Sequence, residues 1–180
     1  MGHLYLLTTF GLPGAGKSTF TERFSAEHQL FYWRGDEVRR RLFDKPQHSA
    51  DENQLMSRAA RYALGQALRA GVSCVYDINH NQRSSRQQYR ELAAVYDATL
   101  VVLQFDVPEA VARRRTQDRV AVADADWQRY YLSFDPEFID RLKPNMQPPG
   151  PEERIIRLDG QADYARQAET VLQQLPGLLR

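Results

Sequence analysis

One glycine-rich segment near the N-terminus constrains the fold more than any other part of the chain. Residues 11–18 read Gly-Leu-Pro-Gly-Ala-Gly-Lys-Ser, a full match to the pattern G-x-x-x-x-G-K-S/T. The apolar run of residues 4–10 before it predicts a strand, and residues 17–28 after it have the spacing of a helix. A chance glycine-rich turn does not explain this agreement. The segment therefore predicts a phosphate-binding loop, or P-loop, between a strand and a helix.

The residue types of this loop suit it to hold a nucleotide. Glycines let backbone N–H groups turn inward around a polyphosphate, and the following helix adds the positive end of its dipole. Lys17 is expected to reach the β and γ phosphates as a point charge, and Ser18 is expected to bind Mg²⁺. The predicted nucleotide-binding residues of the loop are Gly11, Pro13, Gly14, Ala15, Gly16, Lys17, Ser18 and Thr19.

Along the rest of the chain, short apolar runs alternate with longer amphipathic segments. This alternation is typical of βαβ units that build a parallel sheet, so the predicted fold class is α/β. The 180 residues suffice for one sizeable core, and we expect one domain over residues 1–180. The predicted strands are residues 4–10, 30–33, 72–77, 99–107 and 154–158. The predicted helices are residues 17–28, 36–43, 51–70, 84–96, 108–117 and 162–175, with residues 127–142 helical in pieces.

The charge balance and the single cysteine limit the class of protein. The chain has 24 Lys and Arg against 23 Asp and Glu, a net charge of +1, so any contact with nucleic acid must be local. Cys74 lies in an apolar stretch and cannot form an intramolecular disulfide, which suits a reducing compartment. No segment approaches the length of a membrane span. We expect a cytoplasmic protein with no membrane partner.

The residues beyond the loop distinguish among P-loop proteins. A guanine-specific switch would need an Asn/Thr-Lys-x-Asp element after a later strand, and the sequence has none, so ATP is favoured over GTP. A motor or hydrolase usually has two adjacent carboxylates at the end of a strand, whereas here the strand ends Tyr76-Asp77-Ile78. The missing second carboxylate favours phosphoryl transfer to a bound acceptor rather than to water.

Two further groups of polar residues are candidates for the acceptor side of a site. Asp36 and Arg39 are three residues apart and share a helix face, where the carboxylate can accept a hydroxyl proton and the arginine can hold a phosphate. The alternative is an aspartate that caps the helix and pairs locally with arginine. Asp77 can bind Mg²⁺ or orient the acceptor, with a turn aspartate as the alternative. Asn79 and Asn81 suit either acceptor binding or turn formation.

Four motifs in this order resemble the kinase domain of the bacteriophage polynucleotide 5′-hydroxyl kinase and related small bacterial P-loop kinases, including zeta-toxin-like kinases. The P-loop has the proline of that family, and an Asp-x-x-Arg pair follows the second strand. An Asp-x-Asn-x-Asn run follows a later strand, and a Val-Pro helix start precedes a segment rich in arginine. The matching residues are 11–19, 36–39, 77–81, Val107, Pro108, Arg113, Arg114, Arg115 and Arg119.

This resemblance implies a fold and a set of roles. The fold is a P-loop NTPase three-layer α/β/α sandwich with a five-stranded parallel sheet and a helical lid at approximately residues 113–143. Asp36 is the implied general base, Arg39 helps to hold the phosphate of the acceptor, and Asp77 and Asn79 belong to the acceptor site.

In the lid, Arg115 and Arg119 are the implied catalytic pair, which would neutralise charge on the phosphoryl oxygens. For Arg113 and Arg114 a solvated helix face is the better interpretation. The Asp159-Gly160 turn resembles the turn beside adenine in many P-loop kinases and joins the predicted cofactor-binding residues.

The sequence thus predicts a kinase that uses ATP and Mg²⁺ to phosphorylate a hydroxyl. By the resemblance, the first choice of acceptor is the 5′-hydroxyl of a nucleic acid or nucleotide, although a near-neutral charge weakens the case for long polymers. A nucleoside, sugar or antibiotic hydroxyl is the alternative, and a toxin kinase acting on a nucleotide sugar is another. A regulatory ATP-binding module is a different class, which would not need Asp36 and Arg119. The oligomeric state stays open.

Overall fold

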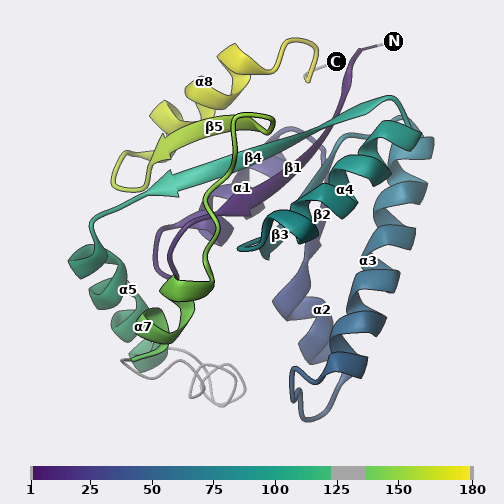
Figure 1. Cartoon of the computed structure of the whole chain (residues 1–180). Helices are drawn as coiled ribbons and strands as arrows, with labels where there is room; N and C mark the ends of the chain where they lie inside the picture. The colour runs from purple at the N-terminus through teal and green to yellow at the C-terminus, as the bar shows by residue number, and fades with distance from the viewer. Residues whose placement is uncertain (1, 123–136, 179–180) are drawn as a thin grey trace.

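Five parallel strands form one sheet in the order β2-β3-β1-β4-β5 (Figure 1). The computed structural model of the chain describes residues 2–122 and 137–178, with the backbone alone for residues 119–122. The predicted α/β class with a five-stranded parallel sheet is confirmed. The strands are β1 (Leu4–Phe10), β2 (Phe31–Arg34), β3 (Cys74–Asn79), β4 (Ala98–Asp106) and β5 (Arg154–Asp159).

Helices cover both faces of the sheet and give the three layers that were predicted (Figure 1). Successive residues of β1 point to opposite faces, as in any strand. Tyr5 and Leu7 pack with α1 and α8, whereas Leu6 packs with α3 and α4. The helices are α1 (Lys17–Glu27), α2 (Gly35–Leu42), α3 (Ala50–Arg69), α4 (Arg83–Val95), α5 (Glu109–Val122), α7 (Phe138–Leu142) and α8 (Tyr164–Gln174), with a 3-10 turn η1 (Lys143–Asn145).

The start of β3 differs from the prediction for a local reason. The strand begins at Cys74 rather than at Val72 and continues to Asn79. The N–H of Val72 donates to the Ala67 carbonyl, and Gly71, at φ +76°, donates to Leu68. These two bonds close the end of α3 in a Schellman motif, so Val72 still belongs to the helix end.

The start of α2 also differs from the prediction. Asp36 was a candidate cap for this helix, as the alternative to its role as a base, but α2 begins at Gly35 and Arg34 holds the cap position without a capping side-chain bond. Asp36 therefore lies in the first turn, where the positive end of the helix dipole favours a carboxylate. Side-chain caps are found instead at α3, where Ser49 accepts from the N–H of Glu52, and at α8, where Asp163 accepts from the N–H of Arg166.

The predicted lid is described in part. The helix α5 continues to Val122, beyond the predicted end at Gln117, and α7 with η1 forms the returning side. Residues 123–136 lie outside the described residues, as does most of the predicted helical stretch 127–142. Within residues 2–122 and 137–178, no helix combines the length and the apolar character that crossing a bilayer requires.

Candidate active site

The P-loop adopts a conformation that only glycine accommodates readily. Gly11, Gly14 and Gly16 have φ values of +142°, +80° and +94°. Gly16 holds the N-cap position of α1 without a side-chain cap, and the first turn of α1 contains no acidic residue. The N–H groups at a helix start have no partner within the helix, so together with the helix dipole they suit an anion such as a phosphate.

The lysine of the loop folds back over the loop itself. Lys17 Nζ donates to the carbonyl oxygens of Gly11 and Leu12, each at 2.8 Å. These neutral acceptors hold the ammonium group at the mouth of the loop. A phosphate oxygen would bind the same ammonium more strongly because it is charged.

Close packing around the P-loop explains one glycine in the loop and one in the turn that lies against it. A Cβ atom on Gly14 would lie 2.2 Å from the carbonyl oxygen of Ala112 in α5. A Cβ atom on Gly160, in the turn after β5, would lie 2.7 Å from the carbonyl oxygen of Ala15. The Asp159-Gly160 turn therefore lies directly against the P-loop, and its predicted place beside adenine stays a prediction.

Arg115 contacts this turn rather than the pocket described next. Its Nη1 atom donates to the Gly160 carbonyl oxygen at 2.7 Å, which ties α5 to the β5–α8 turn. Arg113 instead pairs with Glu109 and Asp140, on the outer side of α5 and α7. Arg119 belongs to α5, but its side chain lies outside the described residues. The catalytic roles of Arg115 and Arg119 stay predictions.

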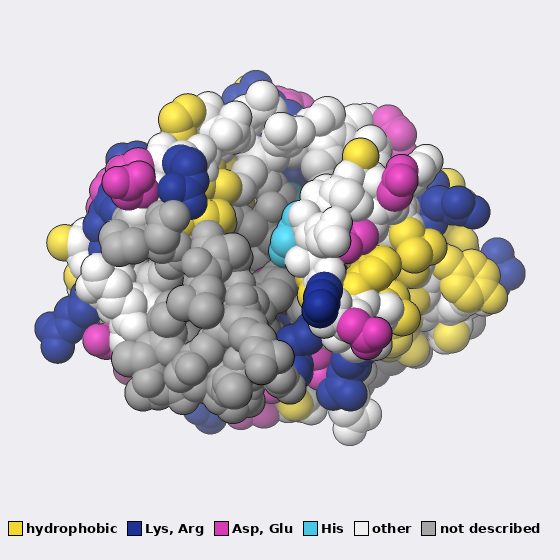
Figure 2. Space-filling model, turned by 90° about the horizontal axis from the view of Figure 1, so that it is seen from below, with side chains coloured by type: hydrophobic (Ala, Val, Ile, Leu, Met, Phe, Trp, Pro, Cys, Tyr) yellow, Lys and Arg dark blue, Asp and Glu magenta, His cyan; other side chains and the backbone are white. Residues whose placement is uncertain are grey.

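A pocket of about 320 Å³ opens beside the P-loop, among the carboxyl ends of the strands. The molecule is hollowed near the centre of this face (Figure 2). The pocket brings together residues that are far apart in the sequence, which is where open α/β sheets bind ligands. Of the predicted site residues, those that line it are Pro13, Gly14, Gly16, Lys17, Ser18, Asp36, Arg39, Asp77 and Asn79.

Asp77 is fixed by a tyrosine that sequence reasoning missed. Asp77 is 5% exposed, and its Oδ2 accepts a hydrogen bond of 2.8 Å from Tyr32 Oη. Burial and the charge of Asp77 raise the pKa of Tyr32 well above its usual range, so the phenol stays a donor. A carboxylate oriented in this way, together with the hydroxyl of Ser18, offers the oxygen ligands that Mg²⁺ prefers.

Arg39 lines the pocket with carboxylate and amide partners of its own. It is 7% exposed and donates to Glu52 Oε2 at 2.8 Å and to Asn53 Oδ1 at 2.6 Å. Hydrogen bonds from the backbone N–H groups of Gln47 and His48 lower the pKa of Glu52, which keeps it ionised. The structure therefore pairs Arg39 with Glu52.

Several pocket residues had no sequence motif to indicate them. Arg34, His48 and Asn53 line the pocket, and each comes from a segment whose pattern predicted only secondary structure or a loop.

Two asparagines of the Asp-x-Asn-x-Asn run also line the pocket. The Oδ1 atoms of Asn79 and Asn81 are buried without a hydrogen-bond partner among the described residues. A buried amide oxygen of this kind is suited to accept a hydrogen bond from a ligand.

The fold and the loop define a P-loop protein. The chain belongs to the AAA domain family whose model, AAA_33, matches residues 6–136. This match, with the structural comparisons below, confirms the resemblance to P-loop kinases. No curated protein sequence matches the chain.

Solved structures with the same fold include several kinases. A sugar kinase of Janibacter sp. is 17% identical over 99% of both chains, with a TM-score of 0.70. The APS kinase CysC of Mycobacterium tuberculosis, in complex with AMPPNP and APS, is 16% identical over 97% of this chain and 99% of that chain, with a TM-score of 0.68. A chain of the Pnkp1/Rnl/Hen1 RNA repair complex is 19% identical over 81% of this chain and 46% of that chain, with a TM-score of 0.62.

Proposed function

We propose that this protein is an ATP-dependent kinase that transfers the γ-phosphoryl group to a hydroxyl. One observation carries the proposal: Lys17 and Ser18 of the P-loop line the same pocket as Asp36 and Asp77. Phosphate-binding groups and carboxylates thus face one space of about 320 Å³, large enough for reacting groups to meet. The kinase neighbours support this reading, and we assign the activity to one domain over residues 1–180.

On the nucleotide side, the residues act chiefly by position and charge. The N–H groups at the start of α1 hold phosphate oxygens, and Lys17 leaves the loop carbonyls to bind the β and γ phosphates. Asp159 and Gly160, in the turn that lies against Ala15, would contact the adenine. Ser18 and Asp77 would hold Mg²⁺, which supplies neutralising charge at the phosphate oxygens when it is bound.

On the acceptor side, Asp36 is the proposed general base. A bond forms between the acceptor oxygen and the γ-phosphorus while the bond to the β-phosphate oxygen breaks, and ADP leaves. The hydroxyl proton passes to the Asp36 carboxylate, which stands in the first turn of α2 and faces the pocket. Arg39 and Asn79 would orient the acceptor, and the lid arginines Arg115 and Arg119 would neutralise charge on the transferred group.

The first proposed acceptor is the 5′-hydroxyl of a nucleic acid or nucleotide. The ordered motifs of the sequence and the neighbour in an RNA repair complex support it. A small alcohol such as a sugar is the second candidate, and one observation favours it. Arg39, the residue expected to hold an acceptor phosphate, already has Glu52 and Asn53 as partners. An acceptor without a phosphate would therefore suit the part of the pocket that Arg39 lines.

Transfer of label from γ-labelled ATP tests the proposal. With Mg²⁺ present, the label should appear on one member of a panel of 5′-hydroxyl DNA and RNA oligonucleotides, nucleosides, sugars and aminoglycosides. The Asp36→Asn variant should lose this product, whereas Asp44→Asn, an exposed aspartate just beyond α2, should keep it. Label on an oligonucleotide would select the first acceptor, and label on a small alcohol the second. ATP binding with no labelled product would favour a regulatory module and contradict the proposal.

A further inference from the structure

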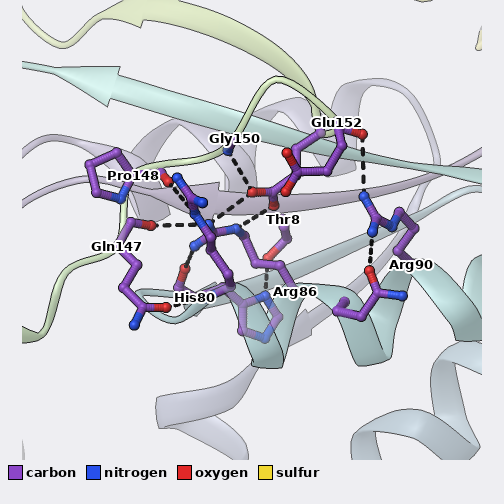
Figure 3. Close-up of polar contacts among 11 residues, drawn as sticks. Thr8, His80, Arg86, Arg90, Gln147, Pro148, Gly150 and Glu152 are labelled. Atoms are coloured by element: carbon purple, nitrogen blue, oxygen red, sulfur yellow. Dashed lines mark hydrogen bonds and ion pairs between the residues drawn. The ribbon is translucent and has the colours of Figure 1, made fainter.

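A buried ion pair lies behind the pocket, where α4 meets the chain that returns from α7 and η1. Arg86 of α4 is fully buried, and it donates through Nε and Nη2 to the two carboxylate oxygens of Glu153, at 2.5 and 3.0 Å (Figure 3). We call residues 146–153 the return segment. Glu153 also accepts from the N–H of Gly150 at 2.8 Å, so both oxygens of its carboxylate are held.

The same guanidinium also holds two backbone carbonyls. Arg86 Nη1 donates to the carbonyl oxygen of His80 at 2.7 Å, and Nη2 donates to that of Gln147 at 3.0 Å. Gln147 in turn donates its N–H to the carbonyl of Asn81 at 2.7 Å. One side chain therefore joins α4, the return segment and the loop after β3 (Figure 3).

The strand β1 holds this loop from the opposite side. Thr9 Oγ1 donates to the Ile78 carbonyl at 2.9 Å, and the His80 Nδ1 atom lies 2.6 Å from Thr8 Oγ1. His80 is 3% exposed. Residues 78–81 are thus fixed through their backbone or side chains on two sides, and we call them the acceptor loop.

Two residues of the acceptor loop line the pocket. Asn79 and Asn81 line the pocket, and the Oδ1 atoms of both are buried without a partner among the residues that the structure describes. An unsatisfied buried oxygen is unfavourable in a folded protein, so a ligand hydroxyl is the natural donor for it. The orientation of these amides depends on a backbone that Arg86 holds in place.

We propose that Arg86 is a positioning residue that sets the acceptor loop for binding the hydroxyl-bearing acceptor. This inference rests on the proposed kinase function. The fold does not depend on the ion pair as such. When a buried Arg–Glu pair is replaced by apolar side chains of similar size, the free energy of unfolding is often unchanged or higher. Apolar side chains cannot donate to the His80 and Gln147 carbonyls. The positioning role can therefore be separated from folding.

The test uses the double variant Arg86→Met/Glu153→Leu with Arg90→Met as the matched control. Arg90 lies one turn further along α4 and donates to the Glu152 carbonyl of the return segment at 3.2 Å and to Gln87, with no bond to the acceptor loop (Figure 3). Both variants lose an arginine that bridges α4 and the return segment. Only the double variant loses the bonds to the acceptor loop and to the Gln147 carbonyl.

Steady-state kinetics use a 5′-hydroxyl oligodeoxynucleotide and, separately, a hexose as probes. The double variant should lose about 10-fold or more in kcat/KM for the accepted probe, chiefly through KM. Its affinity for ATP should stay close to wild type. Its melting temperature should fall, because the His80 and Gln147 carbonyls lose their donor and the Gly150 N–H loses its acceptor, so the kinetics are measured below the unfolding transition. Arg90→Met should match wild type in kcat/KM, ATP affinity and melting temperature. Arg86→Lys, which keeps the charge and one donor, should restore part of the loss. An acceptor KM equal to that of Arg90→Met, in a folded double variant, would overturn the proposal.

Hydrogen exchange of the His80 and Asn81 amides gives a readout that needs no acceptor. These amides bond to the Thr9 and Asn79 carbonyls and should exchange faster in the double variant than in Arg90→Met. Equal exchange would contradict positioning by Arg86. If no probe is phosphorylated by wild type while exchange changes as expected, the proposed acceptors fail and the positioning of the loop stands.

Discussion

The two sides of the pocket are built in different ways. The phosphate side comes from one continuous segment, residues 11–18, and in our proposal it binds through backbone N–H groups and a single lysine. The proposed acceptor side is assembled from side chains of α2, the α2–α3 connection and the end of β3, including Arg39, His48 and Asn79. The first design depends on backbone conformation and suits any nucleoside triphosphate. The second depends on tertiary contacts, so it is where substrate selectivity can differ between proteins of this fold.

The largest expected effect comes from the phosphate side. Lys17→Ala removes the ammonium group at the loop mouth, and phosphoryl transfer should fall by about 100-fold or more because a charge on the transferring group loses its partner. Label transfer from ATP measures it. Lys45→Ala, an exposed lysine after α2, serves as the control and should match wild type. Transfer by Lys17→Ala within a few-fold of wild type would contradict the account of this loop.

A pair of glycine variants separates backbone conformation from packing within the same loop. Ala at either Gly14 or Gly16 takes a left-handed φ, at a penalty of about 1–2 kcal/mol. Gly14→Ala also brings its Cβ to 2.2 Å from the Ala112 carbonyl, whereas the nearest atom to a Cβ on Gly16 is 4.0 Å away. Gly14→Ala should therefore lower the free energy of unfolding more than Gly16→Ala in urea titrations. Equal losses would show that α5 does not pack on the loop as described.

Acid should destabilise the acceptor side through His80. Burial, and then the charge of Arg86, lowers the pKa of His80 to about 3, whereas in the unfolded chain it is near 6.5. Below pH 6.5 His80 binds a proton in the unfolded chain but stays neutral in the folded protein. The free energy of unfolding therefore falls as the pH decreases toward 3. Between pH 7 and pH 5 the loss should be about 2 kcal/mol.

His48 contributes in the same direction, because burial and Arg39 lower its pKa. Urea unfolding should therefore be measured in a His48→Asn background. The ring signals of His80 in NMR spectra should stay constant from pH 7 to pH 5, and a titration near pH 6.5 would contradict the buried, neutral histidine.

The smallest expected effect is at the outer ion pairs of α5. Arg113 is partly exposed and pairs with Glu109 and Asp140, so Arg113→Gln should leave the urea midpoint of unfolding almost unchanged, because solvent screens such pairs. Transfer activity should stay within about 2-fold of wild type, since the side chain faces away from the pocket. A loss of activity comparable to that of Lys17→Ala would contradict this assignment and indicate that Arg113 takes part in phosphoryl transfer.

The contrast between the two sides also explains what the sequence could predict. The P-loop, the five strands and the α/β class depend on contiguous patterns, and the structure has all of them. Two local predictions were wrong because neighbouring residues compete for the same position: Gly35 starts α2 before Asp36, and the end of α3 retains Val72.

The acceptor side was predicted only in part. Asp36, Asp77 and Asn79 carried motif signals, and they do line one pocket. The partner of Arg39, Glu52, belongs to the Ser-x-x-Glu start of α3, a signal of helix capping that gives no hint of a site. Arg86 and Glu153 are 67 residues apart and share no motif, so only the fold brings them together.

In the proposed kinase, one pocket joins a nucleotide site to a carboxylate that activates a hydroxyl. The most direct test measures ATP affinity and phosphoryl transfer in Asp36→Asn beside Asp44→Asn, on the acceptor that the label panel selects. We expect Asp36→Asn to bind ATP as wild type does and to lose about 100-fold or more in transfer, with Asp44→Asn unchanged in both. Transfer by Asp36→Asn at the wild-type rate would contradict the claim.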